Sequence, residues 1–96
     1  FAGQFWAAIH TLRTAGPEPI NHAIIKGYLS INLPQVRRLA NALQIALPPH
    51  ADMKRAMQSS TSPRFIGCRV VRSAITKKSV RCWVFVEDAG VTLSSL

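Results

Sequence analysis

Apolar residues recur near the middle of the chain at the spacing of an amphipathic helix. Between residues 33 and 47 they fall three and four positions apart, which places them in one stripe along a helix. The members of this stripe are Leu33, Val36, Ala40, Leu43 and Leu47. Asn32 is a favourable N-cap, and Pro34 falls in the first turn, where its missing N–H is not needed. Pro48 and Pro49 stop the pattern, which predicts a helix over 33–47.

Two further helices are predicted before this one. Over residues 4–14 an apolar face is formed by Phe5, Ala8, Ile9 and Leu12. Over residues 19–28 Glu18 and Pro19 suit a helix start, and the apolar side comprises Ile20, Ala23, Ile24, Gly27 and Tyr28. Only residues 29–31 separate this helix from the central one, about the length of a helix-turn-helix connection.

Residues 48–63 are the least defined part of the chain. Proline and serine clusters at both ends predict loops. Residues 51–58 between them either form two helical turns or remain mobile, and the pattern leaves both open. In the helical case Met53, Ala56 and Met57 would dock on the core.

The stretch 64–87 predicts a β-hairpin, because residues 68–75 and 80–86 are rich in β-branched and aromatic residues. A two-residue loop at Lys77 and Lys78 would set Ser73 opposite Cys82. One face would then carry Val71, Ile75, Val80, Cys82, Val84 and Val86, and the other Val70, Arg72, Arg81, Trp83 and Phe85.

This hairpin makes predictions for the two cysteines and for the two faces of the sheet. Cys68 and Cys82 would point to opposite faces and could not bond, and a buried structural role is expected for both. One face packs on the helices, and the other is covered by the chain's end or by a second copy. Residues 87–96 form either a short third strand or a frayed tail.

Composition narrows the class of protein. Twelve Lys and Arg against 4 Asp and Glu give a net charge of +8 over 96 residues, which predicts a single basic domain with polyanionic partners. Nucleic acid is the first such partner to expect and an anionic membrane surface the second. No apolar run approaches the ~18 residues of a membrane span, and our prediction is a nucleic-acid partner and no membrane. The first residues lack the order of a signal peptide, and two cysteines are too few for a disulfide scaffold, so we expect a cytoplasmic location.

Candidate catalytic and metal-binding residues are sparse. The carboxylates form no spaced acid–base pair, the three histidines lack metal-ligand spacing, and the five glycines are scattered. A Cys–His dyad from distant segments stays open. We therefore expect no enzyme activity, cofactor, metal site or small-molecule substrate.

Three helices followed by a basic β-hairpin resemble a winged helix-turn-helix domain. The stretch Leu33–Leu43, with its paired arginines, looks like the recognition helix of such domains, and Phe5–Arg13 resembles the first helix of small phage and bacterial versions. The resemblance implies an α+β fold, with a helix-turn-helix core over 4–47, a loop or short helix over 48–63, a hairpin wing over 64–87 and a tail over 88–96. It also implies that residues 33–45 enter the major groove of DNA.

On this interpretation the chain binds double-stranded DNA as a homodimer and acts in transcription regulation or as a mobile-element accessory factor. Its groove-facing side chains would be Pro34, Gln35, Arg37, Arg38 and Asn41, with Gln35 and Arg38 reading base edges. Lys77, Lys78 and Arg81 would hold phosphates.

Two rival functions fit the same residues. The chain could be a protein-interaction module that uses the apolar hairpin face with Trp83. It could instead bind RNA through the sheet, with Trp83 and Phe85 as stacking platforms.

Overall fold

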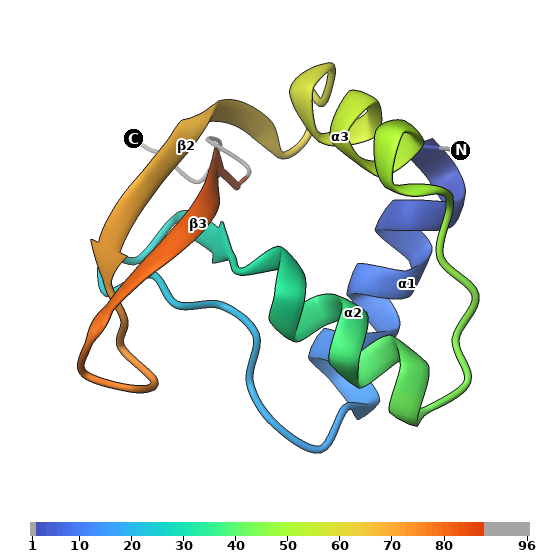
Figure 1. Cartoon of the computed structure of the whole chain (residues 1–96). Helices are drawn as coiled ribbons and strands as arrows, with labels where there is room; N and C mark the ends of the chain where they lie inside the picture. Colours follow the sequence, from blue (N-terminus) through green and yellow to red (C-terminus); the bar gives the residue numbers. More distant parts are fainter. Residues whose placement is uncertain (1, 88–96) are drawn as a thin grey trace.

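The described part of the chain, residues 2–87 of a computed structural model, contains three helices and a three-stranded antiparallel sheet (Figure 1). In chain order the elements are α1 (Ala2–Ala15), β1 (Tyr28–Ile31), α2 (Leu33–Ala42), α3 (His50–Gln58), β2 (Arg64–Arg72) and β3 (Ser79–Val86). The predicted α+β class is confirmed. The segment expected to be a third strand or a frayed tail lies, from residue 88 on, outside the described residues.

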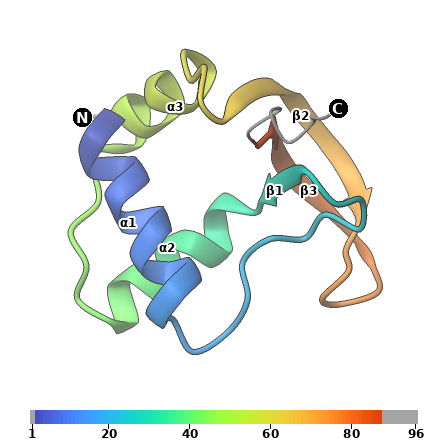
Figure 2. The same ribbon diagram turned by 180° about the vertical axis from the view of Figure 1, so that it is seen from behind.

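The helices gather on one side of the sheet, as both views of the ribbon show (Figures 1 and 2). The core lies between the two layers, and its largest fully buried side chains include Phe5, Leu12, Ile20, Leu29, Ile31, Val36, Met57 and Phe85. Trp6 packs edge-on against Phe5 and Phe85, with ring centroids 5.0 and 5.1 Å apart. Each large apolar side chain buried in this way contributes roughly 1.5–3 kcal/mol.

The first helix agrees with its prediction. The expected face of α1 is buried throughout (Phe5, Ala8, Ile9 and Leu12), and the helix extends slightly beyond 4–14 at both ends. It ends before Pro17, which cannot donate to a continuing helix.

The predicted helix over 19–28 is wrong, because residues 16–27 form no helix and β1 begins at Tyr28. Asn21 organises this segment instead. Its side-chain amide donates to the Tyr28 carbonyl at 3.0 Å, and its oxygen accepts from the backbone N–H groups of Ala23 at 3.0 Å and Ser30 at 2.9 Å. Asparagine side chains compete with helical bonding in this manner.

The end of this segment is also incompatible with a helix. Gly27 adopts φ 94°, a left-handed conformation that glycine tolerates best. β1 then joins the sheet beside β3, where Leu29 and Ile31 point into the core. The predicted hairpin is therefore part of a three-stranded sheet in the order β1-β3-β2.

The central helix begins as predicted and ends early. The Asn32 side chain accepts from the Gln35 N–H at 2.9 Å and caps α2. The helix stops at Ala42 because Gln44 adopts φ 58°, and the Ile45 N–H returns to the Ala40 carbonyl at 2.8 Å. This is a Schellman ending.

The early ending changes the apolar stripe. Leu33, Val36 and Ala40 are buried as expected, whereas Leu43 is exposed and Leu47 only half-buried. Leu39 takes the remaining buried position on α2.

The open question over 51–58 is resolved in favour of a helix. α3 buries Met53, Ala56 and Met57, the three residues expected to dock if it formed. Residues 43–49 connect α2 to α3.

The hairpin strands are confirmed, but their predicted register is wrong. Cys82 lies opposite Arg69 rather than Ser73, because the connection spans residues 73–78. The Ser73 hydroxyl accepts the Ile75 and Thr76 N–H groups at 2.9 and 3.0 Å, which stabilises this longer loop. From Gly67 to Arg72 the shift is even, so the residues paired there keep their predicted faces, whereas Ile75 lies in the connecting loop.

The two hairpin faces have different environments. Trp83 and Phe85 face the helices, while Cys82 and Val84 on the other face are buried by this chain's own residues. Cys68 and Cys82 are both free, as expected from their opposite faces, but Cys68 is exposed and the prediction of a buried role is wrong for it. In residues 2–87 no helix has the length and apolarity needed to cross a membrane.

Candidate nucleic-acid interface

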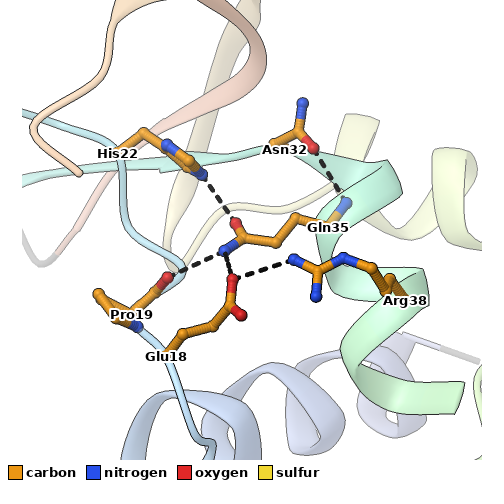
Figure 3. Close-up of polar contacts among 6 residues, drawn as sticks. All are labelled: Glu18, Pro19, His22, Asn32, Gln35 and Arg38. Atoms are coloured by element: carbon orange, nitrogen blue, oxygen red, sulfur yellow. Dashed lines mark hydrogen bonds and ion pairs between the residues drawn. The ribbon is translucent and has the colours of Figure 1, made fainter. Parts of the chain in front are cut away.

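A network of polar side chains joins residues 18–22, α2 and the hairpin loop. Figure 3 shows the part of it between residues 18–22 and the start of α2. Gln35 lies at its centre. Its side-chain Nε2 donates to Glu18 Oε2 at 2.8 Å and to the Pro19 carbonyl at 3.0 Å, and its Oε1 lies 2.7 Å from His22 Nε2. The network continues from His22 Nδ1 to the Ser73 hydroxyl, 2.7 Å away in the hairpin loop.

The hydrogen bonds of the Gln35 amide determine which atoms of this network donate and which accept. Both N–H groups of the Gln35 amide are used, so its Oε1 must accept and His22 Nε2 must carry the proton. His22 Nδ1 then accepts the Ser73 hydroxyl proton. His22 and Ser73 are both buried, and no buried side-chain N or O in the described part of the chain lacks a partner.

Glu18 ties the same network to the outer face of α2. Its carboxylate accepts from Gln35 and forms an ion pair with Arg38 at 3.0 Å. These two hydrogen bonds, that from Gln35 first, lower the pKa of Glu18 below its ordinary value of 4.5. Glu18 is therefore ionised at neutral pH and holds Arg38 against the preceding segment.

The network assigns structural roles to the two residues expected to read bases. Gln35 uses its whole amide inside the chain, so a base contact would require breaking that network. Arg38 remains exposed, but one of its guanidinium nitrogens is engaged by Glu18. Sequence reasoning missed the roles of His22 and Ser73, which no periodicity marks.

All the predicted groove residues of α2 except Gln35 line an open hollow of about 620 Å³. Pro34, Arg37, Arg38 and Asn41 form its α2 side, and Ile45, Leu47, Pro48, His50 and Met53 close it toward α3. The structure thus brings four of the five expected groove residues together with the first turn of α3.

The predicted phosphate-binding residues lie on the hairpin. Lys77 and Lys78 are exposed in the loop 73–78, at the lower left of Figure 1, whereas α3 lies at the top. Arg81 is exposed on β3, and its carbonyl accepts from the Asn32 side chain at 3.0 Å. Together with the His22–Ser73 contact, this bond fixes the hairpin relative to α2.

The exposed face of α3 is also polar, and the sequence analysis did not predict a site there. With Met53, Ala56 and Met57 buried, α3 exposes His50, Ala51, Lys54, Arg55 and Gln58. The signal was the i, i+4, i+8 spacing of His50, Lys54 and Gln58, which places them on one side of a helix.

Most cations of the described chain lack an acidic partner there. Its ion pairs are Arg13–Glu87, Arg38–Glu18 and Arg55–Asp52, the last a long contact of 3.6 Å. Exposed pairs of this kind contribute little stability. The cations that have no acidic partner within residues 2–87 are available to contact a polyanion.

Reactive groups are few within residues 2–87. No cluster of three His, Cys, Asp or Glu side chains there could hold a metal ion. Burial raises the pKa of the Cys82 thiol to about 11, which keeps it protonated at neutral pH. The rings expected as an RNA-stacking platform are not free either, because Phe85 is fully buried and Trp83 packs against the core.

No protein-family model matches the chain, and comparisons with curated proteins and with solved structures give no match.

Proposed function

We propose that the chain binds double-stranded DNA as a winged helix-turn-helix module, with α3 rather than α2 in the major groove. The described chain has three helices before its hairpin, but they are not the three that the sequence predicted, because the helix over 19–28 is absent and α3 is the third helix. In a helix-turn-helix pair the second helix enters the groove. The connection 43–49 is longer than the usual turn of about 3–4 residues.

The two-sided character of α3 carries this proposal. One side is buried in the core, and the other presents an imidazole, an ammonium, a guanidinium and an amide to the surroundings. Lysine and arginine pair with guanine and glutamine with adenine in the major groove. A helix anchored on one side and polar on the other can read bases without distorting the core.

The remaining cations support contacts to the DNA backbone. Arg37 on α2 and Lys77 and Lys78 in the hairpin loop belong to different elements that the His22 network holds together. Phosphate contacts need only charge and reach, so these residues would position the duplex rather than read it. Because the hairpin loop and α3 lie at different ends of the molecule, one duplex would have to run along the whole domain to contact both (Figure 1). We also propose that this DNA binding serves transcription regulation or a mobile-element function.

The homodimer stays part of the proposal. It was expected from the apolar second face of the hairpin and from the symmetry of DNA sites, and on that face Cys82 and Val84 are buried within the chain. A two-fold symmetric DNA site is the remaining argument for a dimer.

The test is a fluorescence-anisotropy titration of labelled duplex DNA at two salt concentrations. Lys54→Ala and Lys78→Ala should each reduce the slope of log K against log salt by about 0.9, and Lys26→Ala, a matched control outside the proposed interface, should leave it unchanged. Gln58→Ala should also cost about 1–3 kcal/mol at the preferred site and relax base preference. Absence of duplex binding at low salt, or stronger binding of single-stranded RNA, would overturn the proposal.

A further inference from the structure

Exposed apolar side chains concentrate in one turn, residues 23–27, which we name the isoleucine turn. Ile24 and Ile25 are 65% and 67% exposed, and Tyr28 directly after the turn is 38% exposed. Isolated exposed apolar residues are common, but a contiguous group on a soluble surface marks a contact site.

Hydrogen bonds hold the isoleucine turn at both ends. Asn21 makes its three bonds on the entry side, and the Ala74 N–H donates to the His22 carbonyl at 3.0 Å. On the exit side the Glu87 N–H donates to the Gly27 carbonyl at 2.9 Å. The two isoleucines are thus presented by a pre-organised backbone, so a partner would not have to order the turn on binding.

A hollow of about 330 Å³ lies between this turn and the outer face of the sheet. Its apolar lining includes Ile24, Ile25, Tyr28, Val71 and Val84. Arg69 and Arg72 on β2 supply its charged side. The volume falls at the lower end of the range of about 300–1,000 Å³ found for binding pockets.

The charged residues that line this hollow are both cations, and Glu87, which lies at the far side of the turn, is paired with Arg13. No carboxylate belongs to its lining, neither Arg69 nor Arg72 has an ion-pair partner in the described chain, and Lys26 lies within the turn. An occupant with carboxylates beside its apolar side chains would satisfy both features. A second copy would bring the same cations and a net charge of +8, and would be repelled.

We propose that the isoleucine turn and the adjoining hollow dock an acidic, leucine-rich or similarly apolar segment of another protein. Arginine and tyrosine beside an apolar pocket are the residue types that anchor protein interfaces. The hollow is concave and takes an inserted side chain, which favours a protein segment over a flat lipid surface. This surface faces away from the helices, so the inference does not depend on DNA binding.

Fluorescein-labelled peptides provide the test with the full chain. A peptide of alternating Glu and Leu should bind, while peptides with Lys in place of Glu or Ser in place of Leu should not. The double change Ile24→Ser and Ile25→Ser should weaken binding about tenfold or more. Leu43→Ser, which alters an exposed leucine at the end of α2, is the matched control and should bind as the parent does.

Charge reversal makes the test specific. Arg69→Glu with Arg72→Glu should abolish binding of the Glu–Leu peptide and confer binding of the Lys–Leu peptide. Circular dichroism of each variant checks folding, which changes at exposed positions should preserve.

Several results would overturn the proposal. Equal binding of the Glu–Ser peptide, or displacement of the Glu–Leu peptide by duplex DNA, would mean that charge alone is recognised. Self-association that the isoleucine changes abolish would assign the surface to a second copy. Retention on phosphatidylserine vesicles without peptide binding would assign it to a membrane.

Discussion

Replacing Gln35 by alanine separates a structural role for this residue from a base-reading role. Its side-chain oxygen is the partner of His22 Nε2, and His22 is only 3% exposed. Removing that acceptor leaves a buried donor unpaired, at a cost of about 1–3 kcal/mol. The better helix propensity of alanine offsets only a few tenths of a kcal/mol.

The expected result is a loss of about 2 kcal/mol, which for a domain of this size lowers Tm by about 8–16 °C. Thermal unfolding followed by circular dichroism measures it. Gln58→Ala is the matched control, because the same chemical change at an exposed site should stay within about 0.5 kcal/mol. An unchanged Tm for Gln35→Ala, together with altered base preference in DNA binding, would refute the structural role.

Three further outcomes follow from the described contacts. The pKa of Glu18 is lowered in the folded chain, so the ionised carboxylate stabilises the fold above pH 4.5, and this stabilisation is lost as the pH falls through the folded-state pKa. Glu18→Gln should therefore show a smaller fall of Tm with decreasing pH than the parent chain. A thiol reagent should modify Cys68 at once and Cys82 only on unfolding, because Cys82 is buried with a pKa of about 11, and rapid modification of both would contradict this. Asn32→Ala should cost about 1 kcal/mol in denaturant unfolding through loss of the α2 cap, whereas Asn32→Gly should cost less.

The sequence predicted elements whose stability comes from their own apolar pattern. The buried face of α1, the cap of α2 and the alternation of the hairpin strands all follow from local spacing. The prediction failed where a single polar side chain outweighed the pattern. Asn21 replaces helical bonds in a segment whose isoleucines had suggested a buried helix face.

The candidate site was less accessible to sequence reasoning. Arg37, Arg38 and Asn41 do meet at one hollow, since their spacing along α2 places them on one side. The contact from His22 to Ser73, however, joins residues far apart in the chain, and only the folded topology brings them together. The end of α2 was also hidden in the sequence, because its left-handed residue is Gln44 and not the glycine that usually marks such an ending.

The position of β3 in the sheet has a consequence for the order in which the chain can fold. β3 is the last described element, yet it is the central strand, and β1 and β2 each pair with it and not with each other. During synthesis the helices emerge first, while two strands wait with unpaired backbone groups until residues 79–86 leave the ribosome. A nascent chain that pauses before this point exposes two strand edges at once, so the synthesis of β3 ends this risk of aggregation through unpaired edges.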